Sequence, residues 1–126
     1  MITPFIRRVA TTVVDSGIDT KQTLYTVPTG KKLIVVAVTL RDATDDFLTS
    51  ITNGVTFGFD AGATDWLPVF SQVELRTLTS ASKYFTKFNT AASVRGNAGN
   101  TFGAIFSNTS NNSDLTIDVF GYLISA

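Results

Sequence analysis

The chain has no cysteine and no histidine among its 126 residues. Without cysteine, it can form no disulfide bond, no thiolate zinc site and no cysteine nucleophile. Without histidine, it lacks the commonest general base and metal ligand, so Ser-His-Asp and Cys-His catalytic arrangements are impossible. We therefore expect a protein that is not an enzyme and that carries no cofactor or metal ion.

Net charge is also missing, because ten lysine and arginine residues balance ten acidic residues. A chain without net charge has no overall field to draw it to DNA, RNA or an anionic membrane. The longest apolar run, Leu33–Val38, is too short to span a bilayer, and no secretion signal opens the chain. We expect a soluble protein whose partners are neither nucleic acids nor membranes.

Strong helix formers are scarce, since Glu74 is the only glutamate and the chain has one methionine. Hydrophobic residues make up 44% of the chain and charged residues only 16%, so threonine, serine, asparagine and glycine must cover much of the surface. This balance suits pleated, half-buried strands. Together with the length, it predicts one domain over residues 1–126 with an all-β fold. The expected architecture is an antiparallel β-sandwich of jelly-roll type with about eight strands.

Alternation of apolar and polar residues, interrupted by turn residues, locates the expected strands. They are Ile6–Val14, Gln22–Val27, Lys32–Arg41, Val55–Phe59, Val73–Leu78, Tyr84–Phe88, Ala91–Arg95, Thr101–Asn108 and Leu115–Ile124. Pro28 and Gly30 predict a tight turn with proline second and glycine fourth. Asp42–Ile51 is expected to be a loop with one helical turn at most. The last two strands are expected to form an antiparallel hairpin because their connector is short and polar.

Two of these strands are apolar on both faces, although a sandwich needs only one apolar face per strand. In the strand Lys32–Arg41, strict alternation predicts that Leu33, Val35 and Ala37 point one way and that Ile34, Val36, Val38 and Leu40 point the other way. In the last strand, Phe120 and Tyr122 oppose Val119 and Leu123. A long loop of the same chain or a second subunit must cover the surplus face. We favour a subunit interface, in a homotrimer, formed by Ile34, Val36, Val38, Leu40, Phe120 and Tyr122.

Two groups of aspartates are the only local clusters that could carry acid chemistry. They are Asp60 with Asp65, and Asp42 with Asp45 and Asp46. A facing carboxylate pair could hydrolyse glycosides, and carboxylate oxygens could bind calcium. Neither cluster matches the EF-hand spacing. Both lie in expected loops, where aspartate commonly bonds to nearby backbone N–H groups, so we favour a role in turns.

Four aromatic residues, Trp66, Tyr84, Tyr25 and Tyr122, could form a platform for sugar rings. Leu67 and Pro68 follow Trp66 and make an apolar context. Packing in the core or in a subunit interface is therefore the favoured interpretation.

Two segments resemble parts of a known class of proteins. Thr23–Val36, which contains Leu-Tyr-Thr-Val-Pro-Thr-Gly-Lys, resembles an opening hairpin found in many phage and prophage virion proteins. Ile117–Ile124, which contains Asp-Val-Phe-Gly-Tyr-Leu, resembles a closing strand of the same sort of protein. The motifs are structural and carry no chemistry of their own. The middle of the chain, from Asp42 to Lys83, shows no such resemblance.

The resemblance implies a small jelly-roll-like structural protein of a bacteriophage particle, made in the cytoplasm of the bacterial host. The favoured role is capsid decoration (cement), with binding to copies of itself and to the major capsid protein. The alternatives are a tail or fibre component, including one that binds a receptor, and a free carbohydrate-binding module.

Overall fold

A computed structural model gives the fold, and it describes residues 6–18, 20–44, 54–60, 67–73, 85–88, 95–97, 99–106 and 113–125. These residues contain no helix and form two antiparallel sheets. The strands are β1 (Arg7–Asp15), β2 (Gln22–Thr26), β3 (Lys31–Arg41), β4 (Val55–Asp60), β5 (Leu67–Val73), β6 (Phe85–Phe88), β7 (Arg95–Gly96), β8 (Thr101–Phe106) and β9 (Asp114–Ser125). The all-β prediction is confirmed.

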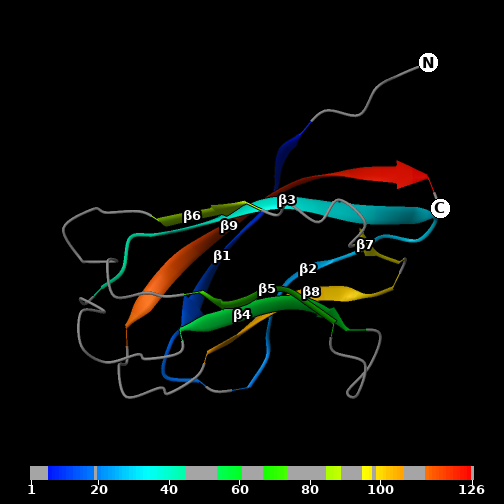
Figure 1. Cartoon of the computed structure of the whole chain (residues 1–126). Helices are drawn as coiled ribbons and strands as arrows, with labels where there is room; N and C mark the ends of the chain where they lie inside the picture. The colour runs from blue at the N-terminus through cyan, green and yellow to red at the C-terminus, as the bar shows by residue number, and fades with distance from the viewer. Residues whose placement is uncertain are drawn as a thin grey trace.

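The two sheets form the two layers of a sandwich (Figure 1). The five-stranded sheet has the order β1-β9-β3-β6, with β7 also paired to β3, and the four-stranded sheet has the order β2-β8-β4-β5. The antiparallel pairs are nested, because β1 pairs with β9, β2 with β8, β3 with β6 and β4 with β5. Successive pairs alternate between the two layers. The two antiparallel sheets agree with the predicted β-sandwich, and the jelly-roll type stays a prediction.

The core lies between the layers and draws residues from both sheets. Its largest fully buried side chains include four phenylalanines, Phe57, Phe59, Phe102 and Phe106. Phe57 stacks on Phe102, with ring centroids 6.2 Å apart and an interplanar angle of 12°. Each buried phenylalanine stabilises the fold by roughly 1.5–3 kcal/mol through removal of apolar area from water. The four-stranded sheet therefore supplies the aromatic half of the core.

A β-bulge in β3 decides which side chains of that strand reach the core. Val35 pairs with Gly121 of β9, but the next pair joins Ala37 to Phe120, so Val36 is the extra residue. An extra residue shifts the alternation by one position. As a result Leu33 and Val35, before the bulge, and Val38 and Leu40, after it, all belong to the core cluster.

The glycine at position 121 is required by the close approach of β9 to β3 beside this bulge. A Cβ atom on Gly121 would collide with the backbone carbonyl oxygen of Ile34 and would lie 3.2 Å from the Cα of Val35. Only glycine leaves room for neighbouring backbone at such a distance. The glycine of the Asp-Val-Phe-Gly-Tyr-Leu segment thus has a packing explanation.

Strand β5 was not expected in the sequence, and its proline explains why. Pro68 would interrupt a central strand because it has no N–H to donate to the ladder. In the structure β5 is an edge strand, Pro68 pairs with Gly58 of β4, and the register shifts nearby. The expected strand Val73–Leu78 keeps only Val73, at the end of β5, and its other residues lie outside the described ranges.

The predicted hairpin at the end of the chain is wrong. β8 belongs to the four-stranded sheet and β9 to the five-stranded sheet, so they are not hydrogen-bonded neighbours. The connection between them crosses from one layer to the other. At the start of β9, the backbone N–H of Ser113 donates to Oγ of Ser16 at 3.0 Å, and the N–H of Asp114 donates to Oγ1 of Thr44 at 3.0 Å. These bonds join the beginning of β9 to the residues that follow β1 and β3.

The turn before β3 also differs from the prediction. The N–H of Lys31 donates to the carbonyl of Pro28 at 3.2 Å, so Pro28 is the first turn residue and Gly30 the third. Gly30 has φ 78°, the conformation that type II turns need at the third position. The strands on either side, β2 and β3, lie in different sheets. The segment that resembles an opening hairpin is therefore a crossover between the layers.

Candidate interaction face

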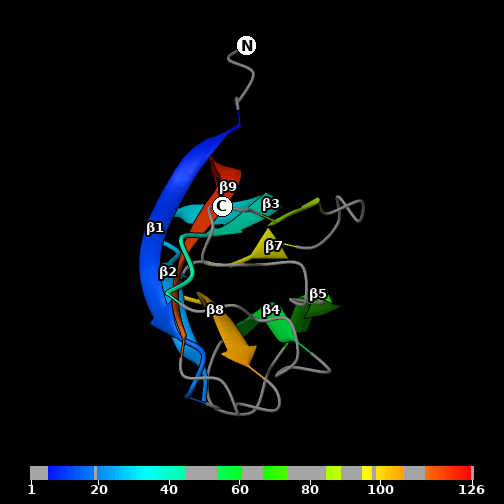
Figure 2. The ribbon, with the colours of Figure 1, turned by 90° about the vertical axis from the view of Figure 1, so that its left-hand side faces the viewer.

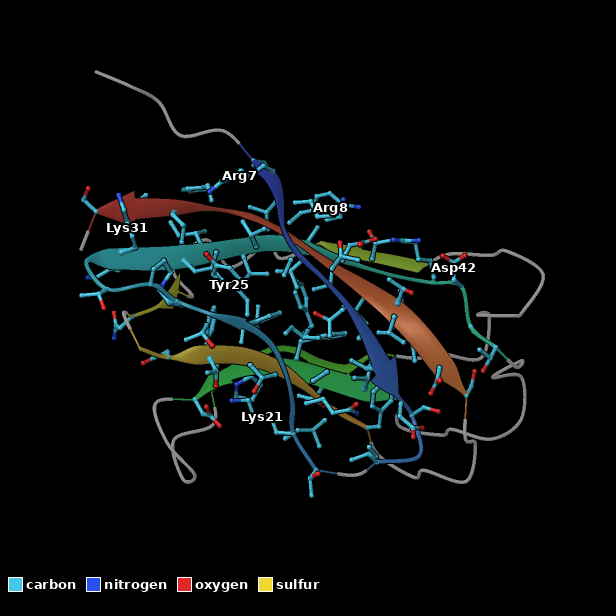
Figure 3. All side chains as sticks on the ribbon, turned by 180° about the vertical axis from the view of Figure 1, so that it is seen from behind. Arg7, Arg8, Lys21, Tyr25, Lys31 and Asp42 are labelled. Atoms are coloured by element: carbon cyan, nitrogen blue, oxygen red, sulfur yellow. The ribbon has the colours of Figure 1, made fainter. Side chains whose placement is uncertain are left out.

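The face of the five-stranded sheet that points away from the four-stranded sheet carries apolar and charged side chains that do not belong to the core between the sheets. We call this surface the outer face. Figure 3 shows Arg7 and Arg8 on this side of the molecule. The outer face is formed by Arg8 and Thr11 of β1, Ile34, Ala37, Thr39 and Arg41 of β3, and Asp118, Phe120 and Tyr122 of β9.

One half of the outer face is apolar. Tyr122 pairs with Ile34, and Phe120 pairs with Ala37 of β3 and with Arg8 of β1. Side chains opposite each other in an antiparallel ladder contact one another. Phe120 and Tyr122 are half-buried, Ile34 and Ala37 are buried, and none of these four side chains belongs to the core cluster. The sheet therefore presents aromatic area on the side away from its own core.

The predicted interface set divides at the bulge. Val38 and Leu40 are fully buried members of the core cluster, so their placement on the face of Ile34 is wrong. The physical reason is the extra residue at Val36, which reverses the alternation in the second half of β3. Val36 is half-buried and outside the core cluster. Ile34, Val36, Phe120 and Tyr122 remain as the predicted interface.

The other half of the outer face is built around the carboxylate of Asp118, whose side chain is 5% exposed. Oδ2 accepts a hydrogen bond from Nε of Arg41 at 2.8 Å, and Oδ1 accepts one from Oγ1 of Thr11 at 2.8 Å. Nη2 of Arg41 lies 3.4 Å from Oδ1, and Nη1 of Arg8 lies 3.8 Å from it. Three neighbouring strands thus meet at one carboxylate, which ties β1, β9 and β3 together on their outer side.

Opposing effects set the protonation of this carboxylate. Burial raises the pKa of Asp118. The hydrogen bonds from Arg41 and Thr11 and the charges of Arg41 and Arg8 lower the pKa by more, so it lies below its ordinary value. The hydrogen bond and the charge of Asp118 raise the pKa of Arg41. The cluster is therefore ionised throughout the physiological pH range. A structural ion pair needs both groups to be charged, whereas a general acid must carry a proton.

Asp42 extends the cluster at the end of β3. Its Oδ2 lies 2.5 Å from Nη1 of Arg41, and its φ is 55°, in the left-handed region that aspartate tolerates better than most residues. Arg41 thus bridges a buried carboxylate and an exposed one.

A second ion pair lies on the four-stranded sheet. Nζ of Lys21 bonds to Oδ1 of Asp60 and to Oγ1 of Thr101, and Thr101 also donates to Asp60 at 2.8 Å. Burial raises the pKa of Asp60, but the bonds from Lys21 and Thr101 and the charge of Lys21 bring it below its ordinary value. The stem of Lys21 passes over Gly103, where a Cβ would lie 2.6 Å from Cε of Lys21.

These contacts bear on the two aspartate clusters considered from the sequence. Asp42 pairs with the adjacent Arg41, and Asp60 pairs with Lys21, which directly precedes β2. Asp45, Asp46 and Asp65 lie outside the described ranges. Among the residues that the structure does describe, no three acidic side chains gather in a way that could hold a metal ion. The geometry at Asp42 and Asp60 is that of structural ion pairs.

The two tyrosines of the possible aromatic platform that lie in the described ranges are not brought together. Tyr25 lies in β2 of the four-stranded sheet and packs against the core, whereas Tyr122 lies on the outer face of the other sheet. Trp66 and Tyr84 lie outside the described ranges. Tyr25 and Tyr122 therefore belong to separate surfaces.

The sequence analysis missed the polar half of the outer face. Asp118 is a lone acid within an apolar strand, and Arg41 ends another strand, which is the signal that could have identified a buried ion pair. Their meeting depends on the β3–β9 register, in which Thr39 pairs with Asp118. Arg8 and Thr11 reach the same carboxylate only because β1 lies on the other side of β9.

Comparison with known proteins identifies no family. No protein-family model matches the chain, and no curated protein matches it. One solved structure to which it is similar is a chain from a cyanophage Pam1 capsid asymmetric unit. The TM-score is 0.48 with 20% sequence identity, over 94% of this chain and 85% of that chain. The described parts of the chain contain no helix that is long and apolar enough to cross a membrane.

Proposed function

We propose that the chain is a non-enzymatic structural protein of a bacteriophage particle, and specifically a decoration protein that binds the major capsid protein and stabilises the head. A protein that binds only the assembled shell stabilises it by mass action. In this proposal the outer face joins copies of the chain to one another, and Phe120 and Tyr122 are its apolar anchors.

One structural observation carries the proposal. The two segments that resemble phage virion proteins are far apart in sequence, but they run side by side as β3 and β9, with Leu33 paired to Leu123 and Val35 to Gly121. The bulge at Val36 and the glycine at 121 fit each other at this junction. The two segments that resemble virion proteins are thus neighbouring strands of one sheet, which supports the view that both belong to the same kind of virion fold.

Self-association into a homotrimer is the second part of the proposal. Aromatic residues are favoured at the centres of protein interfaces because they bury large areas at low entropic cost. The ion pair of Asp118 beside Phe120 gives the same surface a satisfied polar border. The outer face therefore has the composition of an interface in which an apolar patch adjoins fully paired charges.

The deciding experiment places the protein on purified particles and counts it. A domain fused to the chain should label the head in negative-stain micrographs. Quantitative mass spectrometry should give a copy number approaching that of the major capsid protein. Particles assembled without the chain should lose their genome at a lower temperature, and addition of purified wild-type protein should restore the wild-type temperature.

Phe120→Asp tests the proposed face in the same assay, and exposed Ile18→Asp on the turn after β1 is the control. The first variant should fail to restore the particles, and the second should restore them. Label on the tail with few copies per particle would instead indicate the tail or fibre role. Absence from particles would exclude a virion role, and binding of isolated protein on a glycan array would then support a carbohydrate-binding module.

A further inference from the structure

Strand β1 forms one edge of the five-stranded sheet. Within the described parts of the chain its one strand partner is β9, and only its last residue has further backbone bonds: the side chain of Gln22 bonds to the N–H and C=O of Asp15, and the N–H of Ile18 donates to the same C=O. Figure 2 shows β1 along the margin of the molecule, with its side away from β9 facing outward. The backbone N–H and C=O groups on that side form an edge that can accept a further strand.

The middle of β1 has none of the features that normally protect an edge strand from association. Protected edges carry bulges, prolines or charged side chains. From Ala10 to Val14 the register with β9 is unbroken, and these five residues include no proline, glycine or charge. Thr11 is exposed, and Val13 is 67% exposed. Four of the five residues are β-branched, which favours an added strand.

The charges of β1 are arranged so that the strand complements itself. Arg7 and Arg8 open the strand and Asp15 closes it. When two copies run antiparallel, the basic start of each lies beside the acidic end of the other. A contact with twofold symmetry requires such a self-complementary surface. A parallel arrangement would place like charges together.

We propose that two copies of the chain join edge to edge through antiparallel pairing of their β1 strands, so that their five-stranded sheets form one continuous sheet. A pairing centred on Thr12 matches Ala10 with Val14 and Thr11 with Val13. Both sheets then keep their core faces on the same side, because directly opposed residues share a face. The bulge between Arg8 and Ala10 ends the regular part of the strand and limits the added ladder to its middle.

The β1 pair uses the backbone edge of the five-stranded sheet, whereas the proposed trimer contact uses the side chains of Ile34, Phe120 and Tyr122 on the outer face. A twofold contact combined with a threefold one gives a closed assembly of six copies when the two axes intersect at right angles. The β1 pair does not depend on the virion role, since it is tested with isolated protein. Failure on particles and failure of the pair are therefore separate results.

The test combines sedimentation equilibrium with substitutions at the exposed edge. Val13→Asp should raise the dissociation constant of the pair by more than about tenfold, because it places a charge in the apolar middle of the added ladder. Its sheet spectrum should stay unchanged because Val13 is exposed. Ile18→Asp, which changes another exposed aliphatic residue just beyond β1, should leave the dissociation constant within about twofold of wild type.

A charge exchange tests the orientation. Arg7→Glu and Asp15→Lys should each weaken the pair, because each creates a repulsion between the two copies. The double variant Arg7→Glu/Asp15→Lys should recover wild-type association at low salt. Such recovery is expected of an antiparallel pair only. If Asp15→Lys folds poorly, Arg7→Glu still tests the pair by itself, because Arg7 is exposed and the dissociation constant of that variant can be compared directly with wild type.

Amide hydrogen exchange provides a readout that does not depend on substitution. The outward-facing amides of Ala10–Val14 should exchange more slowly as the protein concentration rises. A wild-type protein that stays monomeric at millimolar concentration would overturn the proposal. So would a self-associated protein that is insensitive to Val13→Asp, or one whose β1 amides exchange at the same rate at every concentration.

Discussion

Gly121→Ala should destabilise the fold strongly, although it adds a single methyl group. The new Cβ would meet the carbonyl oxygen of Ile34 at the bulge, where backbone cannot rotate away as a side chain can. β9 and β3 would have to separate at the Val35–Gly121 pair, which lies at the centre of the larger sheet. The perturbation therefore acts on the junction between the two segments that resemble virion proteins.

The magnitude follows from three contributions. Overpacking costs about 1–3 kcal/mol, and each weakened ladder hydrogen bond costs about 0.5–1.5 kcal/mol. Alanine returns about 0.4–1 kcal/mol by restricting the unfolded chain. With two ladder hydrogen bonds weakened, the midpoints of these ranges give a net loss in the free energy of unfolding of about 3 kcal/mol, and we expect a value of about 2–4 kcal/mol. For a domain of this size that lowers the Tm by about 8–16 °C.

Thermal unfolding followed by circular dichroism measures this change, with urea unfolding as a check on the free energy. Gly30→Ala is the matched control, since it has φ 78° and no atom within 4 Å of the added Cβ. Its cost is conformational only, about 1–2 kcal/mol, or about 4–8 °C. If Gly121→Ala melted within about 2 °C of wild type, the close approach of the two backbones would be refuted.

Three further predictions concern the outer face and the aspartates. Phe120→Asp should give a smaller species than wild type in light scattering while keeping its sheet spectrum; unfolding of the variant, or a wild type that is monomeric at micromolar concentration, would contradict the interface. Because the folded pKa of Asp118 is lowered, its stabilisation is present above an unfolded pKa of about 4 and lost as the pH falls through the folded value. The Tm difference between wild type and Asp118→Asn should therefore be larger at pH 7 than at pH 2, and an equal difference at both would count against the ion cluster. Chelator treatment should leave the Tm unchanged, whereas a loss of several degrees that calcium restores would establish a site at the Asp42 or Asp60 cluster.

Patterns of single residues allowed the fold class and most strands to be predicted, because alternation and turn residues are local signals. The two faces of β9 followed the expected alternation, with Leu115, Ile117 and Val119 in the core and Phe120 and Tyr122 outside it. β3 did not follow it, because one inserted residue exchanges the two faces of the strand beyond the bulge, and the composition of the strand does not reveal that residue.

Long-range partners could not be predicted in the same way. The short polar connector before β9 is compatible with a hairpin and with a crossing between layers, and the sequence contains nothing that separates the two. Pro68 led to the prediction that this segment is not a strand, because proline is tolerated in edge strands and the sequence does not show which strands lie at an edge. The cluster at Asp118 likewise required three strands in register before its residues could be connected.

The position of β9 has a consequence for how the molecule is made. β9 comes last in the chain, but it lies between β1 and β3 in the larger sheet. While the ribosome is still adding residues, β1 and β3 have been synthesised but lack the strand that joins them. Pairing β1 with β9 then closes a loop of most of the chain, which slows folding because distant contacts form late. The five-stranded sheet is therefore completed only once β9 itself has been made, and removal of β9 would leave β1 and β3 without their common neighbour.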